Sequence, residues 1–237
     1  AIPGYLLGYL WEQPAFIRDC ATYGEEIIQA SDDMCIVFGN IALDEQKINP
    51  DGRIRKYNAC FVAHHGQLIG DGVSPYPFRI KTLLPNYREF DDSRHFTSLQ
   101  QVADEHGLPL SACLQPTTLQ WSGEQLQLGC LLCEDGWSDD YPVNPTALLK
   151  TNGATLLANL SGSPFTLGKN AKRTRVFSRL ARENNVPLVY INQISVQNNG
   201  KTIYAFDGSS QAYQPDGTIA VSCGAYQPVV TLLRFHP

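Results

Sequence analysis

The stretch that decides the fold is Gln127-Leu128-Gly129-Cys130-Leu131-Leu132-Cys133-Glu134-Asp135-Gly136-Trp137. Its apolar first half predicts a strand that is buried on both faces of a layered domain. Open α/β sheets bind their ligands at the carboxyl ends of such strands. Cys133 at that end, with Gly136 three residues on to permit a sharp turn, is therefore a candidate nucleophile. The alternative is a small buried thiol that packs as a hydrophobic residue.

Length and composition limit the classes of protein to which the chain can belong. It has 237 residues, of which 43% are hydrophobic and 17% charged, so we expect one large domain or two small ones with a sizeable core. The net charge of −5 gives no attraction to nucleic acid or to an anionic membrane. No apolar run approaches membrane-spanning length and no secretory leader is visible, so we predict a cytoplasmic protein.

The seven cysteines are an odd number and lack the spacing of a disulfide framework, which predicts reduced thiols. Cys130 and Cys133 form a C-x-x-C, but strand alternation would put them on opposite faces. No second pair of ligands at zinc spacing accompanies them. We therefore predict neither a metal site nor a redox pair here. The adjacent His64 and His65 are interpreted in the same way, as surface residues of a hairpin rather than metal ligands.

Periodicity and turn residues predict one α/β domain with mixed sheets over residues 1–237. The segment 97–120 is polar and predicts a loop with a weak helix near 98–106. The expected helices are 14–30, 144–152 and 169–184, and the expected strands are 35–41, 57–62, 67–70, 78–81, 126–133, 154–160, 186–192, 203–206, 210–213 and 218–222.

A lysine at the end of a predicted strand is the second unusual feature. Lys81 lies between Ile80 and Leu83, and a cation in apolar surroundings is costly unless it is paired. The side chain is therefore either functional or extended so that only its ammonium group reaches water.

Together the strand ends resemble the nitrilase, or carbon–nitrogen hydrolase, superfamily, and more narrowly the glutaminase domain of glutamine-dependent NAD synthetases. The resemblance covers nearly the whole chain in the right order. Its motifs are Lys81-Thr82-Leu83-Leu84-Pro85-Asn86-Tyr87, Phe90-Asp91-Asp92-Ser93-Arg94-His95-Phe96, Cys133-Glu134-Asp135-Gly136-Trp137, Asn159-Leu160-Ser161-Gly162-Ser163-Pro164-Phe165, Gly168-Lys169, Val189-Tyr190-Ile191-Asn192-Gln193 and Phe206-Asp207-Gly208-Ser209-Ser210.

This resemblance implies a four-layer α-β-β-α sandwich that commonly forms homo-oligomers. The chain would be a single glutaminase domain, with the family's first strand and helix expected before Ala1. No synthetase domain is visible. ATP and deamido-NAD would belong to that domain, which would be the ammonia-accepting partner, and the glutaminase domain itself would need no cofactor.

The superfamily also implies a Glu–Lys–Cys triad whose members meet at one pocket. Cys133 matches the nucleophile, which attacks an amide carbon and forms a thioester. Lys81 matches the cation that stabilises the tetrahedral oxyanion, with the backbone N–H of Glu134 as a second donor. The family's glutamine pocket is matched by Tyr87, Trp137, Ser163 and Lys169. For Lys169, ordinary solvation at a helix end is an equal alternative.

The acids of the site are less well defined. Asp92 and Glu89 are candidate accessory acids that would orient Lys81, and surface charge in a loop is the alternative for both. The family's base is the glutamate of a Pro-Glu-Leu-type motif, which aligns just upstream of Ala1. Glu12 does not match it and is expected to be a solvated carboxylate at a helix start.

These observations predict a thiol amidohydrolase that releases ammonia from glutamine. One alternative is another nitrilase-type amidase that acts on a different acyl group. The second is a non-catalytic interaction module that keeps the fold but lacks the base.

Overall fold

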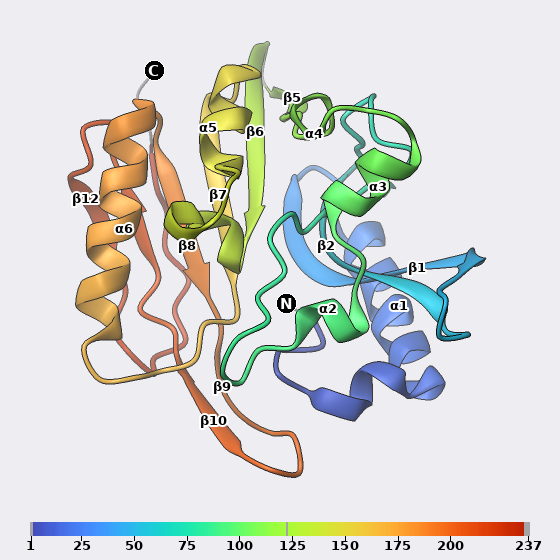
Figure 1. Ribbon diagram of the computed structural model, residues 1–237. Helices are drawn as coiled ribbons and strands as arrows, with labels where there is room; N and C mark the ends of the chain where they lie inside the picture. The colour runs from blue at the N-terminus through green and yellow to red at the C-terminus, as the bar shows by residue number, and fades with distance from the viewer. Residues whose placement is uncertain (1, 122, 235–237) are drawn as a thin grey trace. The chain divides into compact units, whose positions relative to one another are not determined.

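The computed structural model describes residues 2–121 and 123–234. The chain divides into two compact units, one ending at Cys113 and the other beginning at Leu114. Figure 1 shows both units, with labels on many of their helices and strands. Among the described residues, no helix combines the length and the apolar character that crossing a bilayer would require.

The first unit contains a mixed set of short helices and one antiparallel sheet. Strand β2 is the centre of that sheet, because β1, β3 and β4 all pair with it. The elements are the 3-10 helix η1 (Gly8–Glu12), the helices α1 (Pro14–Gln29), α2 (Asp92–His95), α3 (Leu99–Glu105) and α4 (Leu110–Cys113), and the strands β1 (Ile36–Ile48), β2 (Ile54–His64), β3 (Gln67–Leu68) and β4 (Arg79–Ile80).

Helix α1 covers this sheet through a stripe of buried residues at helical spacing. Ile17, Cys20, Gly24 and Ile28 are its buried positions, and the helix contacts β1, β2 and β3. Pro14 starts the helix, where its missing N–H costs nothing. The helix therefore forms where the sequence predicts it.

The second unit is built on a six-stranded sheet with the order β12-β11-β8-β7-β6-β5. A separate two-stranded sheet contains β9 and β10. The elements are β5 (Thr117–Trp121), β6 (Glu124–Leu132), η2 (Cys133–Gly136), η3 (Ser138–Asp140), α5 (Pro145–Thr151), β7 (Leu156–Ser161), α6 (Lys169–Asn184), β8 (Leu188–Asn192), β9 (Ile194–Asn198), β10 (Ile203–Asp207), β11 (Gln211–Tyr213) and β12 (Ile219–Ser222).

Three parallel strands, β6, β7 and β8, form the middle of this sheet. Helix α5 connects β6 to β7 and α6 connects β7 to β8, and the two helices contact each other as well as the sheet (Figure 1). Leu132 pairs with Leu160, and Ser161 pairs with Asn192. The carboxyl ends of all three strands therefore lie at one edge of the sheet, where α/β proteins bind ligands.

The structure confirms a mixed α/β fold but corrects several predicted boundaries. Strand β1 continues to Ile48, well past the predicted end at residue 41, because its polar second half still pairs with β2 although none of it is buried. The segment 97–120 holds the expected helix but also α4 and the polar strand β5, which pairs with β6 on one side only. Strand β9 was not predicted at all. Strand β6 ends at Leu132, one residue before the predicted end, and lies next to the edge strand β5.

Leu157 in β7 provides a test of the core of the second unit. Its side chain is 0% exposed, and we expect Leu157→Ala to lower the free energy of unfolding by about 2–5 kcal/mol, because it leaves a cavity. Leu167, which is 93% exposed, is the matched control, and Leu167→Ala should change stability by no more than about 0.5 kcal/mol. Chemical denaturation followed by circular dichroism measures both, and equal losses would contradict this description of the core.

Candidate functional site

Cys133 begins a tight turn at the carboxyl end of β6. Its φ is +45°, a conformation that costs a non-glycine residue about 1–3 kcal/mol. Surrounding bonds hold the backbone there: the Leu132 N–H donates to the Asp135 carboxylate at 3.1 Å, and Asn159 Nδ2 donates to the Cys133 carbonyl at 3.3 Å. Backbone strain that is maintained in this way is typical of functional sites. The turn thus presents the half-buried thiol beyond the end of the strand.

Gly136 is the last residue of the same turn. Its Cα lies so close to neighbouring side chains that only a glycine fits. Its φ is not positive, but a Cβ at this position would lie 2.6 Å from Phe177 Cε1 and 2.8 Å from Asn159 Nδ2. Asn159 is itself buried, and its Oδ1 accepts a hydrogen bond from Ser161 at 2.6 Å. Any side chain at residue 136 would displace the group that holds the carbonyl of Cys133.

Both acids after Cys133 are buried and hydrogen-bonded. Asp135 accepts from the Leu132 N–H, so its carboxylate stabilises the turn. Glu134 accepts from the Tyr141 hydroxyl at 3.0 Å. The role of the Glu134 backbone N–H as an oxyanion donor stays a prediction.

Ser163 follows β7 and is fixed by a residue whose role the sequence did not reveal. Its N–H donates to Asn192 Oδ1 at 2.8 Å, and Asn192 Nδ2 donates back to the Ser163 carbonyl at 3.2 Å. Asn192 also donates to the Gly208 carbonyl at 3.0 Å. A polar residue at the end of the apolar strand β8 was the available signal for this role.

The other predicted pocket residues occupy different environments. Trp137 packs edge-on against Phe177, and Lys172 Nζ lies 5.4 Å from the centre of its indole ring. Lys169 is half-buried at the first position of α6. Tyr87 belongs to the first unit, where it is exposed and packs edge-on against Phe90. Their contact with a substrate stays a prediction.

Lys81 follows β4 in the first unit and is fully buried. Its Nζ lies 2.6 Å from Asp92 Oδ2, and Asp92 Oδ1 accepts from the Tyr5 hydroxyl at 2.7 Å. The ammonium group also lies 5.1 Å from the centre of the Tyr5 ring. Lys81 is thus a paired cation that does not reach water, and burial of Asp92 argues against its being surface charge. Glu89 is half-buried in the loop before α2.

Glu12 differs from the expected solvated carboxylate, and that prediction was wrong. Its carboxylate accepts from Lys56 Nζ at 2.5 Å and contacts His95 Nδ1 at 2.6 Å, with Arg53 at 3.5 Å. Lys56 and His95 are both buried. Because His95 lies on α2, the short helix that also carries Asp92, Glu12 anchors the element that pairs with Lys81.

The adjacent histidines lie at the β2–β3 hairpin, as predicted, but not on opposite faces. His65 has a φ of +51° in the turn, and its ring centre is 3.8 Å from that of His64. Asp32, Asp33 and His65 place ligand atoms within 4.8 Å of one another, but all three are exposed and such surface groups are common without an ion.

The contacts of Glu12 predict a pH dependence of stability. Burial acts to raise its pKa, but the bonds from Lys56 and His95 and the charges of Lys56 and Arg53 outweigh burial and lower it. A lowered pKa contributes stability above the unfolded-state value of about 4.3, and that stability is lost as the pH falls through the folded-state value. Glu12→Gln should therefore lower the unfolding temperature at pH 7, and the difference from the parent should shrink below about pH 4.

The control for this comparison is Glu26→Gln on the exposed side of α1, which should change the unfolding temperature little at either pH. If Glu12→Gln lowers the unfolding temperature by the same amount at both pH values, the role given to this carboxylate is contradicted.

Gly136→Ala tests the packing of the turn. We expect it to lower the free energy of unfolding by about 1–3 kcal/mol, because its Cβ would overlap Phe177 and Asn159. Gly70→Ala is the control, since its Cβ would be no closer than 3.7 Å to any heavy atom. Thermal denaturation of both variants checks the prediction, which fails if they are equally stable.

Comparisons with known proteins find relatives of this chain. No family model matches the chain. The glutamine-dependent NAD(+) synthetase of Synechocystis sp. is 27% identical over 246 residues, covering 99% of this chain and 38% of the relative. The chain therefore spans little more than a third of the length of that relative.

Solved structures of similar proteins also match the chain. The glutamine-dependent NAD+ synthetase of Acinetobacter baumannii, in complex with ADP, matches with a TM-score of 0.69 and 25% identity, over 94% of this chain and 35% of that one. A carbon–nitrogen hydrolase of Helicobacter pylori G27 matches with a TM-score of 0.64 and 19% identity, over 94% of this chain and 67% of that one, and shows the fold alone. Over nearly its whole length the chain is thus homologous to glutamine-dependent NAD synthetases, with a mixed α/β structure similar to nitrilase-superfamily carbon–nitrogen hydrolases.

Proposed function

We propose that this chain is a thiol amidohydrolase that releases ammonia from glutamine, as the glutaminase part of NAD synthesis. Relatives that include NAD synthetases, and structural neighbours that include carbon–nitrogen hydrolases, support an enzyme of the amidohydrolase kind. The observation that carries the proposal is Cys133, held at a φ of +45° beyond the carboxyl end of a parallel strand.

In the proposed reaction, Cys133 Sγ bonds to the amide carbon of glutamine while the thiol proton passes to a base. The tetrahedral intermediate then breaks its C–N bond, the nitrogen takes a proton and leaves as ammonia, and a thioester remains. Water, deprotonated by the same base, attacks the thioester. Glutamate is released and the thiol regains its proton. The base in this scheme is the glutamate that the family resemblance expects before Ala1.

Lys81 is proposed to stabilise the negative charge that develops on the amide oxygen. Support comes from its ion pair with Asp92, whose Oδ2 lies 2.6 Å from Lys81 Nζ, because a neighbouring carboxylate favours the charged form of a buried amine. The Tyr5 hydroxyl holds the other oxygen of Asp92, which fixes the orientation of the pair. The backbone N–H of Glu134 is the proposed second donor to the oxyanion.

The proposed glutamine pocket includes Tyr87, Trp137, Ser163 and Lys169. The proposed ammonia acceptor is a synthetase domain or subunit that binds ATP and deamido-NAD. This partner is supported by the length of the relatives, since the Synechocystis protein named as a synthetase is matched over only 38% of its length.

The test measures ammonia release from glutamine by the full-length protein. Cys133→Ala should abolish it, and Lys81→Met should lower kcat by about 10²–10³-fold, the usual effect of removing one oxyanion-stabilising group. The double variant should be no worse than Cys133→Ala, because residues that act as one unit lose activity non-additively. Cys223→Ala, at another half-buried cysteine of the same unit, is the control and should retain activity.

Undiminished ammonia release by a folded Cys133→Ala protein would reject the proposal. A panel of amides separates glutamine from other acyl groups, and a preference for short aliphatic amides would point to a different amidase. Reading the encoded sequence ahead of Ala1 tests the base, because a Pro-Glu motif is required there by the proposed reaction.

A further inference from the structure

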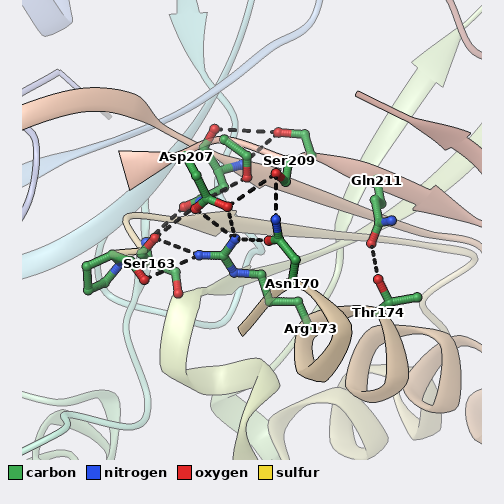
Figure 2. Close-up of polar contacts among 11 residues, drawn as sticks. Ser163, Asn170, Arg173, Thr174, Asp207, Ser209 and Gln211 are labelled. Carbon is green, nitrogen blue, oxygen red and sulfur yellow. Dashed lines mark hydrogen bonds and ion pairs between the residues drawn. The ribbon is translucent and has the colours of Figure 1, made fainter. Parts of the chain in front are cut away.

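A buried arginine lies behind the loop that carries Ser163. Arg173 on α6 is only 1% exposed, and its partner Asp207, at the end of β10, is 0% exposed. Arg173 Nη1 donates to both carboxylate oxygens of Asp207, at 2.8 and 2.9 Å, and to Asn170 Oδ1 at 2.6 Å (Figure 2).

The second terminal nitrogen of the guanidinium group bonds to the loop after β7. Arg173 Nη2 donates to the Ser163 carbonyl at 2.9 Å and to the Pro164 carbonyl at 3.4 Å. The guanidinium group thus joins three separate segments: the loop after β7, the end of β10 and the first turn of α6 (Figure 2).

Ser209 bonds to two of the residues that Arg173 contacts. Its hydroxyl donates to Asp207 Oδ2 at 3.2 Å and accepts from Asn170 Nδ2 at 3.1 Å (Figure 2). Asp207 and Asn170, which both accept hydrogen bonds from Arg173, are therefore also hydrogen-bonded to Ser209.

Stability alone is a weak reason for such an arrangement. Removing two charges from water is costly, and buried ion pairs can often be replaced by hydrophobic residues without loss of stability. What apolar side chains could not supply is the planar fork of donors, which fixes the direction of each acceptor. The geometry therefore indicates that the bonds from Arg173 fix the position of the loop that carries Ser163.

Tyr190 is a fully buried residue of β8, the strand that ends at Asn192. Burial raises the pKa of the Tyr190 hydroxyl, the nearby Cys133 raises it further, and Arg173 lowers it. The ring of Tyr190 packs against Phe177, with centres 4.3 Å apart.

We propose that Arg173 is a positioning residue, which with Asp207 holds Ser163 and the first turn of α6 in the geometry that binds the amide substrate. The inference deepens the proposed function and rests on it, because Ser163 and Lys169 are the proposed pocket residues in those two segments. Arg173 acts through them and has no role in the chemical step.

The experiment compares Arg173→Lys and Asp207→Asn with the parent protein in full-length form. Lysine keeps the charge but cannot reach both the carboxylate and the two carbonyls as a fork. We expect the KM for glutamine to rise about tenfold or more in each variant while kcat changes by less than about threefold, because the loss is in binding.

Arg179→Lys is the matched control. Arg179 lies on the same helix and pairs with Asp139 at 2.6 Å, but that pair is exposed. We expect its kinetic constants to match the parent. Hydrogen exchange provides the second readout, and the amides of residues 161–168 should exchange faster in Arg173→Lys and Asp207→Asn but not in the control.

Unchanged KM and unchanged exchange in Arg173→Lys and Asp207→Asn would overturn the inference, as would a loss confined to kcat. If either variant fails to fold, Asn170→Ala decides, because it removes an exposed arm of the network and leaves the ion pair. It should raise KM and speed exchange to a smaller degree, and no effect on either would count against the inference. A parent protein without glutaminase activity would reject the proposed function, and the exchange data would still decide whether Arg173 holds the loop.

Discussion

Backbone hydrogen bonds between β6, β7 and β8 are the constraint on which the second unit depends. Their parallel register brings Leu132, Ser161 and Asn192 to the same edge of the sheet. A shift of one residue would turn every side chain of a strand to the opposite face. Asn159 can bond to the carbonyl of Cys133, and Asn192 to the loop of Ser163, only because this register is kept.

Each unit also contains a buried ion pair. Lys81 pairs with Asp92 in the first unit, and Arg173 pairs with Asp207 in the second. In each case a further hydroxyl, from Tyr5 or Ser209, bonds to the carboxylate. Additional bonds of this kind are what makes a buried ion pair tolerable, because they replace the water that both charges lose.

The sequence predicted most helices and buried strands, because long periodic segments and helix caps are local signals. Helix α6 begins and ends where expected, and Asn144 caps α5 by accepting from the Ala147 N–H. Cys133 and Lys81 could be singled out as candidates from motifs at strand ends. Asp92 was a candidate partner of Lys81 from the sequence, but the full burial of the pair was not predicted, and it argues against a lysine whose ammonium group reaches water.

The remaining features depend on contacts between residues that are far apart in the chain. His95 meets Glu12 across 83 positions, and Arg173 meets Asp207 across 34. Neither pair has a local pattern, so the sequence predicts a solvated carboxylate at Glu12 and gives no signal for the burial of Arg173. Edge strands such as β5 are missed for a different reason, since their polar composition is compatible with a loop.

The left-handed backbone of Cys133 restricts which residues evolution or design could place there. A branched β-carbon is strongly disfavoured at positive φ, so threonine, although it carries a hydroxyl, would force the strand end to change shape. Serine has the same unbranched geometry as cysteine and would fit. The choice of reactive atom at this position is therefore limited to sulfur or an unbranched hydroxyl by the main chain, before any question of reactivity arises.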